Sequence, residues 1–304
     1  FMNNLFCFEP IDGMTMHYYA DGENPYKLIA DELAPGKIGF DKNWASKHTI
    51  SVLKERDDLI PVLGSDPIDI CKSHKDEAEK EALRHAASIN DMAVEFGIKH
   101  IDPSLDELTL SNMIEEFFEE HGAVQDMQLQ YVCYGKNAAE PHHGAVAGEM
   151  LKEGDAVLFD LWAPINNYWC DMTRTVFYKS CSEEHRKVYE IVKAAQQAAI
   201  DFVKPGVKMS DVDAVARKVI TDAGYGEYFL TRTGHGVGMT VHEPPEASPS
   251  CDLIAEPGMC FSIEPGIYLK DDVGVRIEDL VIVTEDGCEV LTKYPKDLQI
   301  VGND

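Results

Sequence analysis

Three acidic residues interrupt stretches of this chain that otherwise have the composition of buried β-strands. Asp160 lies in residues 156–162 (AVLFDLW), Glu264 follows the apolar segment FSI, and Glu278 lies in the long run VRIEDLVIV. An isolated carboxylate is costly to bury, so such groups are normally paired or bound to a metal ion. Whatever fold the chain adopts must therefore bring positive charge to these positions.

A fourth acid, Asp171, lies beyond a turn-forming segment at residues 163–167 (APINN). A hairpin centred between Ile165 and Asn166 would place it directly opposite Asp160, with the two Cβ atoms about 5 Å apart. Two carboxylates at that distance repel each other unless a cation lies between them. The alternative is that both are strand-end acids paired with lysines.

A histidine framed by glycines adds a nitrogen ligand. His235 lies in residues 233–238 (TGHGVG), where glycines on both sides let backbone and metal approach closely. A phosphate-binding loop is a weaker interpretation, because no Lys-Ser/Thr pair or helix follows. Four carboxylates and one imidazole suit Mn²⁺, Co²⁺ or Zn²⁺. The set is large enough for a pair of metal ions: Asp160, Asp171, His235, Glu264 and Glu278.

A reaction class follows from such a metal pair. Two divalent cations bridged by carboxylates lower the pKa of a shared water and produce hydroxide near neutral pH. Attack of hydroxide on a carbonyl gives a tetrahedral oxyanion, which needs hydrogen-bond donors nearby. The candidate donors are His142 or His143 in EPHHG, His242 in VHEPP, and Arg276. For His242, the alternative interpretation is a histidine in a surface loop.

The charge of the chain excludes some partners. Acidic residues outnumber basic ones by 54 to 27, for a net charge of -27. Nucleic acids and anionic membranes need a basic surface, so neither is expected to bind. The eight cysteines form no CxxC pair, and no signal peptide or membrane span is visible. We therefore expect a cytoplasmic protein with reduced thiols. Because the chain opens at Phe1, this expectation leaves room for a signal segment upstream.

The pattern of elements divides the chain at about residue 72. Residues 1–72 are loop-rich, with strand-like pieces at 4–8 and 37–40 and a helix expected from Asn24 to Leu33. This stretch is small for a self-sufficient α/β domain, so we expect a short or truncated α/β N-terminal segment.

Residues 73–304 show the order helix, helix, strands twice. This repeat predicts an α+β domain with pseudo-twofold αα-β halves and a site between two half-sheets. Two ligands would then come from the first half and three from the second. The expected helices start at Ser73, Leu108, Ser182 and Ser210, and Gly97 is expected to end the first one. The expected strands are 129–134, 156–162, 168–178, 228–231, 259–263 and 275–283.

Six motifs in this order resemble the pita-bread metallopeptidases of the Xaa-Pro dipeptidase (prolidase) and Xaa-Pro aminopeptidase type. They are DLW at 160, CDMTRT at 170, TGHGVG at 233, VHEP at 241, SIEPG at 262 and VRIED at 275. The resemblance runs from about Lys75 to Val301. It implies a pita-bread (creatinase/aminopeptidase-like) catalytic domain and hydrolysis of the Xaa-Pro bond of dipeptides or peptide N-termini by a metal-bridging hydroxide.

The same resemblance implies two divalent metal ions, Mn²⁺ or Co²⁺ and in some relatives Zn²⁺. By position, Asp171 and Glu278 would bridge the two metals. Asp160 would complete one ion, and His235 with Glu264 the other. Glu264 would also carry the proton between the bridging water and the leaving group.

The resemblance assigns the remaining catalytic positions as well. His242 and a histidine after Pro141 would contact the substrate and stabilise the tetrahedral intermediate, with Arg276 in the same relay. Counting forward from Gly135 favours His142 as this histidine, whereas counting back from Asp160 favours His143. We take His142, because it directly follows the proline.

Other functions share parts of this pattern. Methionine aminopeptidases use the same five ligands, but the VRIED motif and the N-terminal segment favour the proline-specific branch. A non-catalytic peptide-binding relative would typically lose ligands, and a creatinase-like hydrolase does without metal. The implied substrate is a peptide or dipeptide with proline at the second position, and the implied assembly is a homodimer. Neither the native metal nor the preferred substrate length follows from the sequence.

Overall fold

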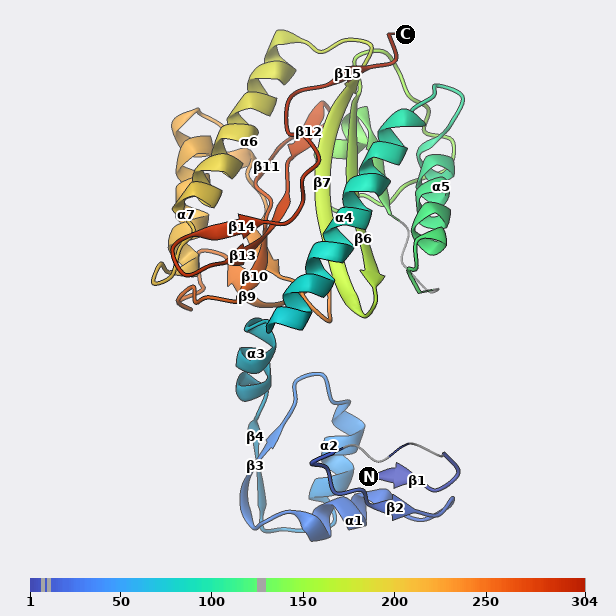
Figure 1. The fold of residues 1–304 in the computed structure, drawn as a ribbon, viewed down its shortest axis with the longest axis vertical. Helices are drawn as coiled ribbons and strands as arrows, with labels where there is room; N and C mark the ends of the chain where they lie inside the picture. Colours follow the sequence, from blue (N-terminus) through green and yellow to red (C-terminus); the bar gives the residue numbers. More distant parts are fainter. Residues whose placement is uncertain (7–8, 10–11, 125–129, 304) are drawn as a thin grey trace. The chain divides into compact units, whose positions relative to one another are not determined.

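The computed structural model describes residues 1–6, 9, 12–124 and 130–303. The chain forms two compact units, Phe1–Cys71 and Lys72–Asp304 (Figure 1). Every expected metal ligand lies in the second unit.

The first unit has a small core of Ala30, Val52 and Leu59. The helix expected after Asn24 is confirmed, because the Asn24 side chain caps it and proline occupies its first turn. The strand expected at 4–8 is wrong for residues 4–6, which form a turn, and 7–8 lie outside the described residues. The elements are β1 (Met2–Asn3), β2 (Tyr18–Tyr19), α1 (Pro25–Glu32), β3 (Gly36–Phe40), α2 (Ser46–Leu53) and β4 (Leu59–Leu63).

Polar side chains cap most of the long helices of the second unit. Asp76 forms a reciprocal capping box with Glu79 at the helix that begins at Glu77, and Ser182 caps the helix that begins at Glu183. The helix expected to start at Ser210 begins at Met209 after Lys208, without a side-chain cap. The helices are α3 (Asp66–Ser73, which crosses the unit boundary), α4 (Glu77–Lys99), α5 (Glu107–Glu120), α6 (Glu183–Phe202) and α7 (Met209–Asp222). No helix in the described part of the chain is long and apolar enough to cross a membrane.

Two expectations about the first of these long helices were wrong. The cap of α4 is Asp76 and not Ser73, because the Asp76 carboxylate accepts from the backbone of Glu79. The helix also continues past Gly97. A Cβ there would lie 2.9 Å from side-chain atoms of Ile114 and Phe159, so the glycine serves close packing inside the helix.

Two sheets lie between the helix pairs. The first has the order β15-β7-β6-β5 and the second β14-β13-β10-β8-β9. Figure 1 shows the α4–α5 pair and the α6–α7 pair flanking these strands. The strands of the first sheet are β5 (Tyr131–Tyr134), β6 (Ala156–Ile165), β7 (Tyr168–Tyr178) and β15 (Ile300–Val301). The strands of the second are β8 (Gly234–Gly236), β9 (Glu243–Ala247), β10 (Cys260–Ile263), β13 (Asp279–Val283) and β14 (Cys288–Val290).

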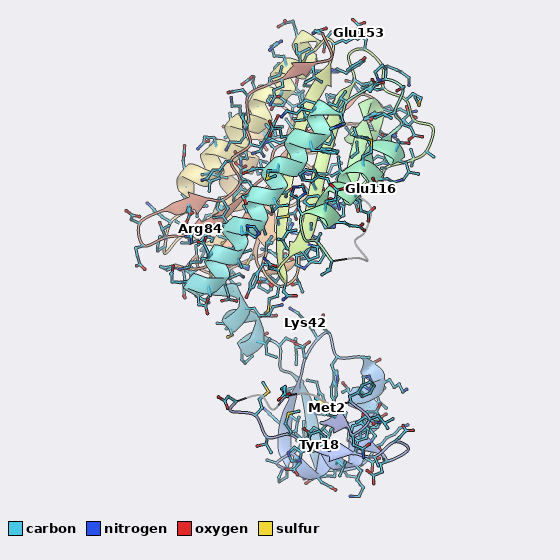
Figure 2. The ribbon with its side chains drawn as sticks, turned by 45° about the vertical axis from the view of Figure 1, so that its right-hand side comes forward. Met2, Tyr18, Lys42, Arg84, Glu116 and Glu153 are labelled. Atoms are coloured by element: carbon cyan, nitrogen blue, oxygen red, sulfur yellow. The ribbon has the colours of Figure 1, made fainter. Side chains whose placement is uncertain are left out.

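The first sheet shares a hydrophobic core with α4 and α5 and the second with α6 and α7, while Leu83 of α4 also packs against the second sheet. Phe118 of α5 packs with Val132 and Phe159 of the first sheet, and Val192 of α6 packs with Phe261 of the second. Charged side chains such as Glu116 and Glu153 lie on the outer surface of this unit (Figure 2). The expected order of helix pair and strands therefore occurs twice.

The β6–β7 hairpin has a different register from the predicted one. Asp160 faces Thr173, and Asp171 faces Trp162. The turn residues are Asn166 and Asn167, both with positive φ, and such a two-residue turn shifts the hairpin centre by one position. Asp160 and Asp171 therefore share one face of the sheet as diagonal neighbours.

The second half departs from the predicted strands in two places. Residues 228–231 form no strand, since the short 3₁₀ helix Gly226–Tyr228 occupies the start of this stretch. The run 275–283 is divided between two strands. Arg276 ends β12 (Val273–Arg276), which pairs with β11 (Gly266–Leu269), and Asp279 begins β13. Leu129 of another expected strand lies outside the described residues.

A close backbone contact brings β12 against the 3₁₀ helix Gly135–Ala139. A Cβ at Gly274 would lie 1.7 Å from the carbonyl oxygen of Ala138. This approach also brings the Arg276 side chain to the chain segment before His142, where Arg276 Nη1 donates to the carbonyl oxygen of Pro141 at 3.1 Å.

Gly274→Ala is expected to lower the free energy of unfolding by about 3 kcal/mol, because backbone atoms must move to admit the methyl group. Gly287→Ala is the matched control, since a Cβ at Gly287 meets nothing within 4 Å. Urea unfolding of both variants measures the difference. Equal stability of the two would contradict the close contact.

Candidate metal centre

The five candidate ligands line one cavity of about 280 Å³ in the second unit. Asp160 and Asp171 come from β6 and β7 of the first sheet. His235 lies on β8, Glu264 directly follows β10, and Glu278 directly precedes β13. The cavity therefore receives two acids from one half of the unit and three groups from the other.

Three of the five side chains form a tight cluster. One ligand atom from each of Asp171, His235 and Glu278 lies within 4.8 Å of the other two. All three residues are at most 5% exposed. Glu278 Oε1 is buried without a hydrogen-bond partner among the residues that the structure describes. A buried carboxylate oxygen that faces other acids and has no donor fits a metal ligand.

The electrostatics of the cluster support the same interpretation. Burial raises the pKa of Asp171 well above its ordinary value, and the neighbouring charge of Glu278 raises it further. Burial also raises the pKa of Glu278, together with the charges of Glu264 and Asp160. The protein groups around these two carboxylates thus carry too little positive charge to stabilise both in the ionised form. A divalent cation would supply the missing charge.

His235 is oriented toward the acids. Its Nε2 lies 3.5 Å from Asp171 Oδ2 and 3.2 Å from Glu264 Oε1. Its Nδ1 lies 3.2 Å from the carbonyl oxygen of Gly236. A ring protonated on Nδ1 can donate to that carbonyl, which leaves the Nε2 lone pair free for a metal.

Glu264 is held in its charged form. Burial alone would raise its pKa, but a protonated His235, together with the charge of Arg276, lowers the pKa of Glu264 to about 2, and a bound metal cation would take the place of that proton. Ser262 Oγ also donates to Glu264 Oε1 at 3.0 Å. The carboxylate is therefore ionised and fixed in orientation at neutral pH.

Asp160 has an arginine partner, although burial still raises the pKa of this carboxylate above its ordinary value. Arg276 Nη2 donates to Asp160 Oδ2 at 2.5 Å, and Arg276 Nε donates to Thr173 Oγ1 at 2.9 Å. Thr173 Oγ1 in turn donates to Glu278 Oε2 at 2.8 Å. Arg276 does not itself line the cavity. It fixes the side chain of Asp160 directly and that of Glu278 through Thr173.

The two adjacent histidines lie in different environments. His142 lines the cavity, and its ring centre lies 6.5 Å from that of Tyr131. His143 lies outside the cavity lining, with its Nδ1 3.7 Å from Glu140 Oε2. Of the two, His142 has the position that contact with a substrate requires.

His242 also lines the cavity, and its ring meets the edge of the His235 ring at 4.1 Å between centres. Partial burial of the ring lowers the pKa of His242 to about 4, helped by the nearby charges of His235 and Arg232. The ring is therefore neutral at pH 7, and one of its nitrogens can donate a hydrogen bond.

Five further cavity residues were not predicted. Trp162 had a detectable signal, because it shares a strand face with Asp160 at a spacing of two. Tyr131 faces Asp160 across the β5–β6 pair, which sequence spacing does not show. Arg232 Nε is buried without a hydrogen-bond partner among the described residues, so the wall carries an unpaired cationic donor. The set is Tyr131, Trp162, Thr231, Arg232 and Val241.

Asp279, which the sequence analysis left out of the ligand set, lies in a separate buried network. Its two oxygens lie 2.7 Å from Arg174 Nη2 and 2.7 Å from Lys296 Nζ. Although burial would raise its pKa, these two cations lower the pKa of Asp279. Arg174 also donates to the carbonyl oxygen of Glu278. The network thus fixes the backbone at a candidate ligand.

The family model of Metallopeptidase family M24 matches residues 81–285. The chain therefore belongs to this family, and the protein is a metallopeptidase. It is 39% identical to an Xaa-Pro dipeptidase of Lactobacillus delbrueckii subsp. lactis, over 93% of this chain and 79% of that protein.

Solved structures show the same relationship. The prolidase of Thermococcus sibiricus superposes with a TM-score of 0.88 at 37% identity, over 95% of this chain and 80% of that one. The X-Pro aminopeptidase of Thermotoga maritima gives a TM-score of 0.82 at 29% identity, over 93% and 82%. The predicted pita-bread fold is thus confirmed.

Added Mn²⁺ is expected to raise the unfolding temperature of protein first treated with EDTA. A cation that binds only the folded state stabilises it by about 2.7 kcal/mol at 100 times its Kd. Glu278→Gln should lose most of this increase, whereas Glu285→Gln, at an exposed acid, should keep it. Differential scanning fluorimetry measures the shift, and an undiminished shift in Glu278→Gln would count against the cluster as a metal site.

Proposed function

We propose that the protein is a dinuclear-metal-dependent exopeptidase that hydrolyses the Xaa-Pro bond of dipeptides or of peptide N-termini. The observation that carries the proposal is the buried, undercompensated cluster of Asp171, His235 and Glu278. It lies in one cavity with Asp160 and Glu264, in a chain of family M24.

The proposed metals are Mn²⁺ or Co²⁺, with Zn²⁺ as the third candidate. Asp160, Asp171, His235, Glu264 and Glu278, which line the same cavity, would together hold the two ions. When bound, the pair would supply Lewis acidity and a hydroxide at neutral pH.

The chain's own side chains would then move protons and stabilise charge. The ionised Glu264 carboxylate is suited to accept a proton from the attacking water and to deliver it to the leaving amine of proline. His242, neutral at pH 7, and His142 would donate to the oxygen of the tetrahedral intermediate. Arg276 and Thr173 would keep the carboxylates of Asp160 and Glu278 in their orientations.

The size and lining of the cavity support a small substrate with an apolar ring. A volume of about 280 Å³ is close to the lower end of ligand pockets. Tyr131, Trp162 and Val241 provide apolar wall against which a pyrrolidine ring can pack. Relatives named Xaa-Pro dipeptidase and prolidase favour the same substrate class.

We propose residues 73–304 as the catalytic domain. A homodimer, which the family resemblance implies, and a cytoplasmic location, which the acidic charge and the cysteine pattern favour, both belong to this proposal.

The substrate proposal predicts a sharp preference for proline. With Mn²⁺, kcat/KM for Ala-Pro and Leu-Pro is expected to exceed that for Leu-Ala by at least about tenfold, and EDTA should abolish the activity. Measurement of released amino acids tests this. Release of methionine from Met-Ala-Ser with Ala-Pro left intact would instead establish a methionine aminopeptidase.

His242→Ala is expected to lower kcat for Ala-Pro by about 100-fold, because one donor to the developing oxyanion is lost. The bound metal should stay at the wild-type level, since His242 is not among the proposed ligands. His85→Ala removes an exposed histidine from α4 and should leave kcat unchanged. Wild-type kcat in His242→Ala would remove this residue from the mechanism.

A further inference from the structure

A second buried ion pair lies outside the metal centre. Lys75 Nζ donates to Glu243 Oε1 at 2.5 Å, and the two side chains are only 1% and 2% exposed. Burying two opposite charges is often no more stabilising than burying apolar residues of the same size. Such a pair is therefore weak as a source of stability, and its place in the fold becomes the informative feature.

The pair is connected to the backbone of His242. Glu243 directly follows His242 and begins β9. Thr240 Oγ1 lies 3.1 Å from Glu243 Oε2 and 3.1 Å from the carbonyl oxygen of His242. Lys72 Nζ lies 3.3 Å from the same Glu243 oxygen. The carboxylate thus joins the segment that carries His242 to two lysines before α4.

The lysine is itself anchored to regular structure. The backbone nitrogen of Lys75 donates to the carbonyl oxygen of Gly258 at 3.0 Å, and its Nζ also donates to the carbonyl oxygen of Lys72 at 2.7 Å. The segment before His242 closes tightly over the pair. A Cβ at Gly238 would lie 2.4 Å from Glu243 Oε1 and 3.0 Å from Lys75 Cε.

The His242 ring has no comparable support of its own. Residues 237–242 form no helix or strand, and His242 is only partly buried at the cavity wall, with a large part of its surface open to solvent. Within the described part of the chain, no hydrogen bond reaches its ring, which only meets the edge of the His235 ring. The position of the ring therefore depends on its backbone, and the contacts of Thr240 and Glu243 fix that backbone.

We propose that the buried Lys75–Glu243 pair positions His242 over the candidate metal centre. Neither Lys75 nor Glu243 lines the cavity, so both act through His242 and are positioning residues. The inference rests on the proposed function only in one respect, namely that His242 donates a hydrogen bond to the reacting substrate.

A double-mutant cycle between Lys75→Met and His242→Ala tests the proposal. Lys75→Met removes the charge but keeps an unbranched apolar chain, and it is expected to lower kcat/KM for Ala-Pro about tenfold, mainly through kcat. In the His242→Ala background the same change should cost less than about twofold, because the positioned group is gone. Equal losses in both backgrounds, or no loss in wild type, would overturn the proposal.

Two variants control for folding and for loss of charge. Lys193→Met removes a lysine from an exposed pair with Asp297 and should leave kcat/KM unchanged. Lys75→Met with Glu243→Leu replaces both buried charges and should recover the unfolding temperature. If that double variant also recovered kcat/KM, the ion pair would not be what positions His242.

A readout without substrate separates this inference from the proposed function. In ¹⁵N-histidine-labelled protein, the ring signal that His242→Ala removes should shift in Lys75→Met and stay in place in Lys193→Met. If the wild type hydrolyses no Xaa-Pro peptide, the proposed function fails while this experiment still decides the positioning role. An unmoved signal in Lys75→Met would overturn it.

Discussion

Repulsion between buried carboxylates is the constraint on which the rest of this structure depends. Arg276 compensates Asp160, and His235 lies against Glu264. The protein provides no such partner at Glu278 Oε1, among the residues described, and burial raises the pKa of Asp171 and Glu278. Divalent cations resolve this imbalance more completely than protonation, because they also hold the oxygens in place.

The two-sheet architecture explains how the acids can be brought together. The β6–β7 hairpin presents Asp160 and Asp171 on one face. The second half supplies His235 from within β8, and Glu264 and Glu278 from positions next to strand ends. Two buried arginine side chains then fix these elements from the side that faces away from the cavity. Arg174 contacts the backbone of Glu278, and Arg276 reaches its side chain through Thr173. Side chains on such rigid elements keep their geometry better than side chains on loops.

Local sequence predicted much of the fold and the candidate ligands. The 3.6-residue periodicity of apolar residues located the long helices, although their expected starts at Ser73 and Ser210 were misplaced. Acids within apolar runs marked Asp160, Glu264 and Glu278. The register of the β6–β7 hairpin was missed because it depends on the conformation of Asn166 and Asn167. Pairings between distant residues leave no local signal. Arg276 meets Asp160 across 116 positions, and Lys75 meets Glu243 across 168.

We propose that the four carboxylates and the imidazole of the cavity together bind a pair of metal ions. Elemental analysis of protein incubated with Mn²⁺ and then dialysed, for wild type and Asp171→Ala, tests it most directly. We expect about two ions per chain in the wild type and their loss in the variant, which removes one of the proposed ligands. Wild-type protein without retained metal, or a variant that binds as much metal as wild type, would contradict it.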